Sequence, residues 1–131
     1  MYEYKILQVV KVVDGDTIDV IIDVGFDILR KERVRINRVD TPEVSSKDEL
    51  ERKLANEAKQ FITEWFKSQS SIYIKTTKDD KYGRILGEIF NNDNEYLNTI
   101  LIDRGYAWEY FGGTKNKDLS LLLEKRKNYE N

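Results

Sequence analysis

The first forty residues alternate between apolar and polar side chains in a way that predicts a series of short strands. Residues 6–13 are mostly β-branched and apolar, and the dipeptide Asp14-Gly15 that follows is typical of a turn. From Thr17 to Val24 the side chains alternate, which is the period-two pattern of a half-buried strand. A third strand is predicted over Leu29–Val39. Its apolar side chains share one face and its polar side chains the other: Val34 and Ile36 against Arg33, Arg35 and Asn37.

After Pro42, the only proline, the period of the apolar residues changes from two to three or four. This spacing predicts an amphipathic helix from about Lys47 to Gln69. Ser45 or Ser46 is a candidate N-cap for it. The apolar residues that set the period are Leu50, Leu54, Ala58, Phe61, Ile62, Trp65 and Phe66.

The rest of the chain predicts two more strands and two more helices. The strands are expected at Ser71–Thr77 and Arg84–Phe90, and a short helix at Tyr96–Arg104 is closed by Gly105. A last helix is expected at Leu119–Lys127. It has Asp118 as its N-cap and three leucines on one face: Leu119, Leu122 and Leu123. Residues 1–131 therefore predict one α+β domain. Their order fits a five-stranded OB-type barrel with three helices packed against it, although it does not distinguish a closed barrel from an open sheet.

The chain has 131 residues, which is the length of a single domain, and it contains no histidine and no cysteine. These two absences exclude a Ser–His–Asp or Cys–His nucleophile, a histidine general base and a His/Cys zinc site. Any acid–base chemistry must therefore use Asp, Glu, Lys, Arg or Tyr. A bound metal would be a hard cation such as calcium or magnesium.

The net charge of −2 argues against a nucleic-acid binder, but the charge is unevenly distributed along the chain. Residues 1–29 carry a net charge of −4, residues 30–38 carry +4, and residues 75–84 carry +2. The basic segments fit a surface for an anionic partner. They are explained equally well by strand faces that are exposed to solvent.

Three short polar clusters fall at predicted strand ends or turns. They are Val13-Asp14-Gly15-Asp16-Thr17, Val39-Asp40-Thr41-Pro42-Glu43 and Asp80-Lys81-Tyr82-Gly83-Arg84. The first offers carboxylates to a hard cation, and the third is rich in donors that suit phosphate oxygens. In the second, Pro42 favours an extended Thr41, whose carbonyl is then available as a ligand. Each cluster taken alone is explained better by a polar turn or connection than by a functional site.

Together, the clusters supply what hydrolysis of a phosphodiester requires. They provide carboxylates for a cation, a further carboxylate to accept a proton, and two arginines from separate strands. Arginine suits this reaction because its planar fork binds two phosphate oxygens and keeps its charge.

In this order, the three clusters resemble those of the staphylococcal nuclease (thermonuclease) family. The resemblance runs from about Val9 to Phe111 and includes the order of strands and helices, and also the stretch Arg104-Gly105-Tyr106-Ala107. It implies an OB-type five-stranded barrel with three helices. It also implies calcium-dependent hydrolysis of DNA and RNA, in which the P–O5′ bond breaks and 3′-phosphate ends remain.

The resemblance implies a calcium site and assigns residues to it. Asp16 and Asp40 would ligate the ion directly, together with the carbonyl of Thr41. Asp14 would contact the ion through water. All four positions carry the family's residue types.

The resemblance also implies catalytic and substrate-binding residues. Glu43 would orient or deprotonate the attacking water, and Arg35 and Arg84 would bind the scissile phosphate. Lys81 and Tyr82 would contact a neighbouring phosphate of the substrate strand. The correspondence is blurred after Ala107, where the family places aromatic residues near the nucleotide. Tyr110 or Trp108 is therefore either a platform for a base or packing at the barrel edge.

Two other functions remain open at the level of sequence. One is a non-catalytic OB-fold module that binds single strands or a peptide. The other is an interaction domain in which calcium is structural. No leader and no apolar run of the roughly 20 residues that a membrane span needs is visible. We therefore expect no membrane partner. We also expect the protein to be a monomer. We expect it to be cytoplasmic, or secreted if an upstream signal has been removed.

Overall fold

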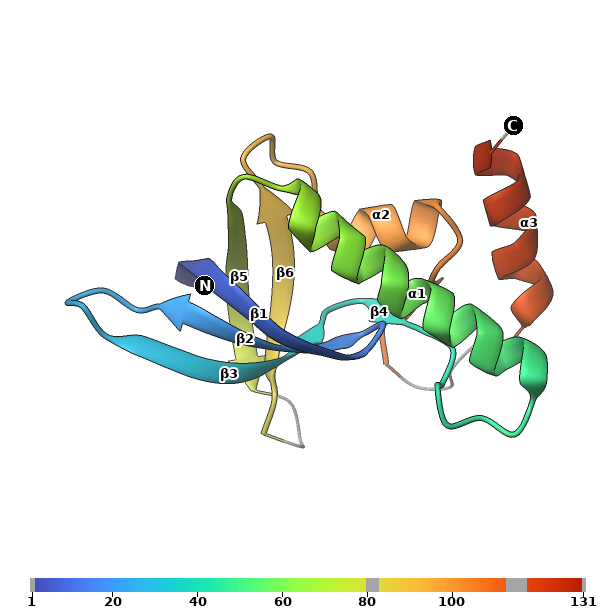
Figure 1. The fold of residues 1–131 in the computed structure, drawn as a ribbon, viewed down its shortest axis with the longest axis horizontal. Helices are drawn as coiled ribbons and strands as arrows, with labels where there is room; N and C mark the ends of the chain where they lie inside the picture. Colours follow the sequence, from blue (N-terminus) through green and yellow to red (C-terminus); the bar gives the residue numbers. More distant parts are fainter. Residues whose placement is uncertain (1, 80–82, 113–117, 131) are drawn as a thin grey trace.

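A closed five-stranded barrel forms the centre of the protein (Figure 1). The structure is a computed structural model that describes residues 2–79, 83–112 and 118–130. The strands are β1 (Tyr2–Asp14), β2 (Thr17–Asp23), β3 (Leu29–Ile36), β4 (Val39–Asp40), β5 (Ile72–Asp79), β6 (Ile85–Asn91) and β7 (Trp108–Glu109). The helices are α1 (Glu49–Ser68), α2 (Leu97–Asp103) and α3 (Leu119–Glu130).

The barrel strands follow the order β1-β2-β3-β6-β5, and β5 pairs with β1 to close the ring. Neighbouring strands are antiparallel except for β3 and β6, which run parallel. β4 and β7 form a separate two-stranded ribbon. The predicted α+β barrel with three helices is thus confirmed.

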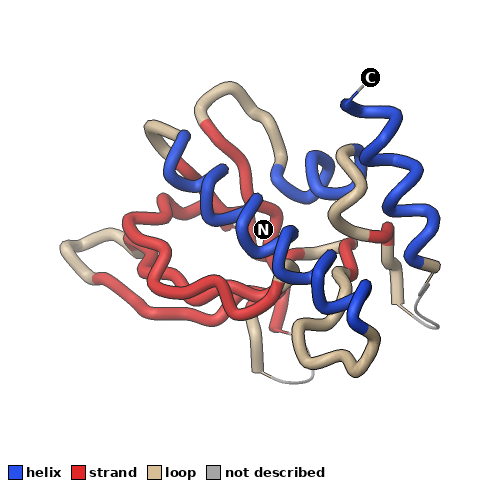
Figure 2. Tube along the Cα trace, turned by 45° about the vertical axis from the view of Figure 1, so that its right-hand side comes forward, coloured by secondary structure: helices blue, strands red, loops and turns tan. Residues whose placement is uncertain are grey.

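The core follows the predicted alternation in β2 and β3. Ile18, Val20 and Ile22 are buried, and so are Val34 and Ile36 on the neighbouring strand. Alpha-helix α1 crosses the strands diagonally (Figures 1 and 2) and adds the apolar face that its periodicity predicts. The buried residues of that face are Leu54, Ala55, Ala58, Ile62, Trp65 and Phe66.

The start of α1 differs from the prediction. Its N-cap is Asp48, whose carboxylate accepts a hydrogen bond from the backbone N–H of Leu50 at 2.9 Å. Neither Ser45 nor Ser46 caps the helix. Instead, the Ser46 hydroxyl donates to Glu51 at 2.8 Å, which ties the preceding loop to the first turn of the helix.

Two other elements also differ in extent. The predicted strand Leu29–Val39 is interrupted after Ile36 by a turn in which Arg38 has a φ of 66°, and the chain resumes as β4. Alpha-helix α3 runs on to Glu130, and of the three predicted leucines Leu122 is buried whereas Leu123 is 42% exposed. None of the helices described is long and apolar enough to cross a membrane.

Candidate active site

Segments from four parts of the chain meet at a polar cavity of about 260 Å³. They are the β1–β2 turn, β3, the segment from Asp40 to Ser45, and the start of β6. The charged residues that line this cavity are Asp14, Asp16, Arg35, Asp40, Glu43 and Arg84. The structure therefore brings together six of the residues that the sequence selected, and the Thr41 side chain joins them.

The β1–β2 turn carries Asp14 and Asp16 into the cavity. Gly15 between them lies so close to the following segments that a Cβ atom there would be 2.8 Å from Cγ2 of Thr41. The same Cβ would be 3.1 Å from Cβ of Ala58 in α1. The turn is thus pressed against both the Thr41 segment and the helix, and this contact fixes where the two carboxylates lie.

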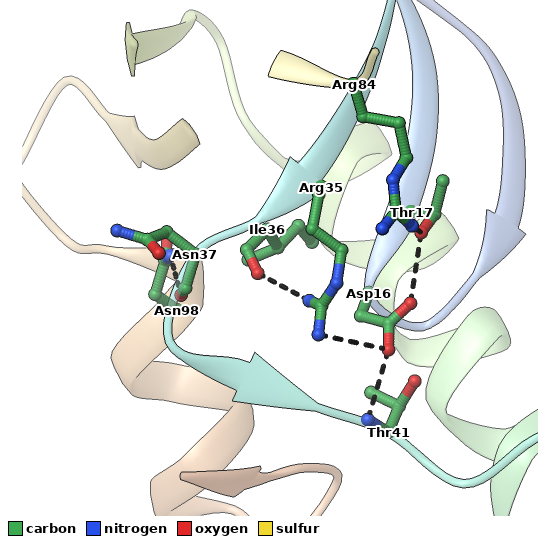
Figure 3. Close-up of polar contacts among 8 residues, drawn as sticks. All are labelled: Asp16, Thr17, Arg35, Ile36, Asn37, Thr41, Arg84 and Asn98. Atoms are coloured by element: carbon green, nitrogen blue, oxygen red, sulfur yellow. Dashed lines mark hydrogen bonds and ion pairs between the residues drawn. The ribbon is translucent and has the colours of Figure 1, made fainter. Parts of the chain in front are cut away.

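The carboxylate of Asp16 connects three of the converging segments (Figure 3). Its Oδ1 accepts a hydrogen bond from the Thr17 hydroxyl at 3.1 Å, and its Oδ2 accepts one from the backbone N–H of Thr41 at 3.3 Å. Nη2 of Arg35 lies 3.8 Å from the same Oδ2. Asp16 is therefore held by a donor from β2, one from the Thr41 segment and a guanidinium from β3.

The two arginines reach the cavity from adjacent parallel strands. Arg35 is buried and its Nη1 donates to the carbonyl of Ile36 at 2.7 Å. Arg35 pairs with Leu86 of β6, and Arg84 directly precedes that strand, two residues before Leu86, so that both arginines line the cavity. Nη1 of Arg84 donates to the Thr17 hydroxyl at 3.3 Å. Both guanidinium groups thus flank the Asp16–Thr17 segment.

Asp40 and Thr41 are buried, whereas Glu43 is exposed at the rim of the cavity. Asp40 is held in place by the pairing of β4 with β7, where it lies opposite Trp108. The backbone N–H of Glu43 donates to the carboxylate of Glu51 at 3.1 Å. The exposed carboxylate of Glu43 is therefore carried on a loop that the first turn of α1 restrains.

The turn that precedes β4 is held by Asn98 of α2. Its Nδ2 donates to the carbonyl of Asn37 at 2.7 Å, as Figure 3 shows, and its Oδ1 accepts from the N–H of Ile89 at 3.0 Å. This buried amide links β6 to the end of β3. It thereby fixes the point from which the chain continues to Asp40.

Burial and neighbouring charges change the acidity of Asp14. Its partial burial, together with the negative charge of Asp16, raises the pKa of the Asp14 carboxyl above 3.8. Glu43 acts in the same direction, while the charges of Lys59 and Arg84 oppose it. The cavity as a whole is lined by four carboxylates and two guanidinium groups, so a bound cation would offset its excess of acidic groups.

Thr17 lines the cavity and the charge of Lys59 acts on Asp14, although the sequence singled out neither residue. Thr17 bridges Asp16 and Arg84, and its position directly after Asp16, in the first cluster, was the available signal. Lys59 follows Ala58, which contacts the β1–β2 turn. Nothing in the helical period distinguishes Lys59 from the other lysines of α1.

The remaining predicted residues lie elsewhere. Lys81 and Tyr82 fall outside the described residues. Tyr110 is half-buried and does not line the cavity, and its N–H donates to the carbonyl of Arg38 at 2.8 Å. Trp108 is 4% exposed and its indole N–H donates to the carbonyl of Asp118 at 3.0 Å, so its ring packs inside the protein.

The oxygen donors of the cavity suit a hard cation. In the described part of the chain, no group of three or more Asp or Glu side chains is arranged to hold a metal ion by itself. A cation here would therefore need backbone carbonyl or water ligands in addition to carboxylates. Asp16, Asp40 and the Thr41 carbonyl offer that kind of mixed oxygen set.

A family model for staphylococcal nuclease homologues matches residues 33–129. The chain belongs to this family. An uncharacterized endonuclease of Escherichia coli is 30% identical over 103 residues, which are 79% of this chain and 60% of that protein. An uncharacterized protein of Methanocaldococcus jannaschii is 33% identical over a gapped alignment of 146 positions, which covers 95% of this chain and 68% of that protein. The micrococcal nuclease of Shigella flexneri is 26% identical over a gapped alignment of 111 positions, which covers 79% of this chain and 57% of that protein.

The residues matched by the family model include only some of the residues that line the cavity. Arg35, Asp40, Glu43 and Arg84 lie within the matched residues, whereas the β1–β2 turn precedes them. The fold brings that turn and its two carboxylates to the matched residues. The chain spans 60% of the length of the Escherichia coli relative and 57% of the Shigella flexneri relative.

Proposed function

We propose that this protein is a calcium-dependent nuclease that hydrolyses phosphodiester bonds of DNA or RNA as a monomer. The observation that carries the proposal is the cavity itself, where two guanidinium groups face four carboxylates in a member of the staphylococcal nuclease family. Cleavage is proposed at the P–O5′ bond, so that the products carry 3′-phosphate ends.

The arginines bind the phosphate in this proposal. Hydrolysis of a phosphodiester builds negative charge on the phosphate oxygens, which fixed cations stabilise. Arg35 is buried and held by the Ile36 carbonyl, so its charge is directed into the cavity before the substrate arrives. Arg84 approaches from the other side of Thr17 and supplies a second guanidinium.

Glu43 is proposed as the residue that orients and deprotonates the attacking water. Its side chain is exposed at the rim of the cavity, where water and substrate have access. A carboxylate is a weak base. Glu43 would therefore depend on a nearby cation and on ordered water for much of the activation.

Asp16, Asp40 and the carbonyl of Thr41 would hold the calcium ion, with Asp14 contacting it through water. When bound, calcium would stabilise charge on the phosphate and increase the acidity of the attacking water. The excess of four carboxylates over two guanidinium groups supports a cation at this position, because a bound cation would offset it. Lys81, Tyr82 and Tyr110 remain proposed contacts to the substrate strand.

Cleavage of denatured DNA in calcium and in a chelator tests the proposal. Degradation in calcium that stops in the chelator is expected, and equal degradation in both would contradict the calcium requirement. Calcium should also raise the unfolding temperature of the protein. An ion at 100 times its dissociation constant adds about 2.7 kcal/mol to the free energy of unfolding. Asp16→Asn should abolish this increase.

Substitutions test the catalytic residues. Arg35→Ala and Arg84→Ala should each lower kcat by about 10²–10³, as for one lost oxyanion donor, and Glu43→Gln by about 10²–10⁴. Arg30→Ala is a matched control on β3, because Arg30 is exposed and lies far from the cavity. A wild-type protein that binds strands without cleaving them would instead support a non-catalytic OB-fold module.

A further inference from the structure

Beyond Arg35, the side of β1, β2 and β3 that faces away from the core carries further charged side chains. Side chains alternate across a strand, so the residues between the buried positions of β2 and β3 point away from the core. Arg35 pairs with Thr17, and two residues further along Arg33 pairs with Asp19. On the other side of β2, Asp19 pairs with Lys11 of β1. Lys11, Asp19 and Arg33 therefore form a row across the three strands. This row is adjacent to the one that contains Thr17 and Arg35.

The following row adds another cation, since Lys31 of β3 lies opposite Ile21. Lys11, Lys31 and Arg33 are exposed, and we call these three residues the basic strip. Asp19 lies among them and is mostly covered. Its carboxylate accepts hydrogen bonds from Nε of Arg33 at 2.8 Å and from Nη2 at 3.1 Å.

The neighbouring cations also change the acidity of Asp19. The hydrogen bond from Arg33 holds the pKa of Asp19 below 3.8, and the charges of Arg33, Lys31 and Lys11 lower it further. Asp19 is therefore ionised at neutral pH and neutralises one of the three cations. The other two remain available to an anion.

The spacing of the rows suits an anion that repeats. Successive rows on one face of a strand are about 6.8 Å apart. Arg35 lies in the first row and inside the cavity, Arg33 and Lys11 lie in the second row, and Lys31 lies in the third. The cations therefore form a line that begins at the candidate cleavage site and follows β3 outward.

We propose that a nucleic-acid strand bound at Arg35 continues along the basic strip, where its phosphates contact Lys11 and Lys31 while Arg33 remains paired with Asp19. The inference rests on the proposed function in that its polyanion is the substrate of the same site. It explains how a chain with a net charge of −2 binds such a partner, because a local line of cations is sufficient. The inference also predicts that the bound strand runs from the cavity outward along β3.

Binding of a fluorescent single-stranded 20-mer, measured by anisotropy in a chelator, tests this independently of cleavage. The variant Lys11→Gln/Lys31→Gln removes two cations and keeps the Arg33–Asp19 pair. Binding at 50 mM salt should weaken by roughly tenfold or more, and the slope of log K against log salt should fall by about 1.4, since each phosphate contact to a single strand contributes about 0.7. Lys125→Gln/Lys127→Gln on α3 is the matched control, because both lysines are exposed there.

Asp19→Asn tests the same surface in the opposite direction. It removes the carboxylate that neutralises Arg33, so binding should become several-fold tighter and the slope should rise by about 0.7. Thermal unfolding of each variant verifies that it is folded. Equal binding by the Lys11/Lys31 variant and its control would overturn the basic strip, as would a wild-type protein whose binding does not depend on salt. Salt-dependent binding without hydrolysis in calcium would support the basic strip and contradict the proposed nuclease.

Discussion

Gly15 shows how a single missing side chain positions the candidate site. Its substitution by alanine would place a Cβ 2.8 Å from Cγ2 of Thr41, and Thr41 would have to move. Thr41 donates its N–H to Asp16 and is a proposed ligand, so the carboxylates would move with it. We expect Gly15→Ala to lower kcat by about 10²-fold, as a displacement of about 1 Å does. The measurement is kcat on denatured DNA beside the free energy of unfolding, which should fall by about 1–3 kcal/mol.

Gly87→Ala is the matched control for this prediction. A Cβ at Gly87 would lie 2.6 Å from Cδ1 of Ile74, inside the barrel core rather than in the cavity. It should destabilise the protein by a similar amount and leave kcat nearly unchanged. If both variants lost activity in proportion to their stability, Gly15 would have only a structural role.

The sequence predicted the turn at Asp14-Gly15 but not what the glycine contacts. A dipeptide of this type indicates a turn because of its own backbone preferences. The contact between Gly15 and Thr41 depends on how the turn packs against a segment much further along the chain. For the same reason, the role of Thr17 between Asp16 and Arg84 became visible only in three dimensions.

Arg126 makes several of the contacts that attach α3 to the rest of the protein, beside the buried side chain of Leu122. The Arg126 guanidinium lies 4.4 Å from the centre of the Tyr106 ring and forms an ion pair with Glu57 of α1. Its Nε also donates to the carbonyl of Gly105 at 3.0 Å. Gly105 itself has a φ of 81°, and a Cβ there would lie 2.5 Å from the Leu122 carbonyl oxygen. The helix therefore packs directly on this backbone.

We expect Arg126→Ala to detach α3 without unfolding the barrel. A helix of 12 residues is marginal on its own, so it should lose its helical structure once its contacts are gone. Hydrogen exchange should show loss of protection in α3 alone, while the barrel amides stay protected. Lys127→Ala, one position along the same helix, is the control. Loss of protection throughout the barrel would show that α3 is part of the cooperative core.

Periodicity predicted α1 better than α3, and the reason is the kind of contact that each helix makes. Alpha-helix α1 packs an apolar face against the barrel, and apolar faces repeat with the helical period. In α3 only Leu122 is fully buried, and Leu123 is exposed. Its attachment through Arg126 and Tyr106 is a cation–π contact with an ion pair, which leaves no hydrophobic period in the sequence.

At the scale of the whole molecule, the order of strands and helices was predictable, but their closure into a barrel was not. The ring closes through the parallel pair β3–β6 and the antiparallel pair β1–β5, which join segments distant in the chain. The register of β3 with β6 also places Arg84 two residues before Leu86, the partner of Arg35, and both arginines line the cavity. Motifs selected the site residues, whereas their proximity depends on this long-range register.

This closure predicts that residues 33–131, which begin where the family match begins, do not fold alone. The fragment lacks β1 and β2, which lie between β3 and β5 in the barrel. It also lacks the buried side chains of Ile6, Ile18, Val20 and Ile22. At about 1.5–3 kcal/mol each, these four side chains contribute roughly as much as the 5–15 kcal/mol by which a typical domain is stable.

Circular dichroism and amide NMR spectra of the fragment should therefore show an unfolded chain. Adding a peptide of residues 1–32 should restore dispersed amide signals, because it supplies both missing strands and their core side chains. A chain that ends at Gly112 is the control, since it lacks α3 but keeps all five barrel strands and should stay folded. Cooperative unfolding of residues 33–131 by themselves would show that the barrel does not depend on its first two strands.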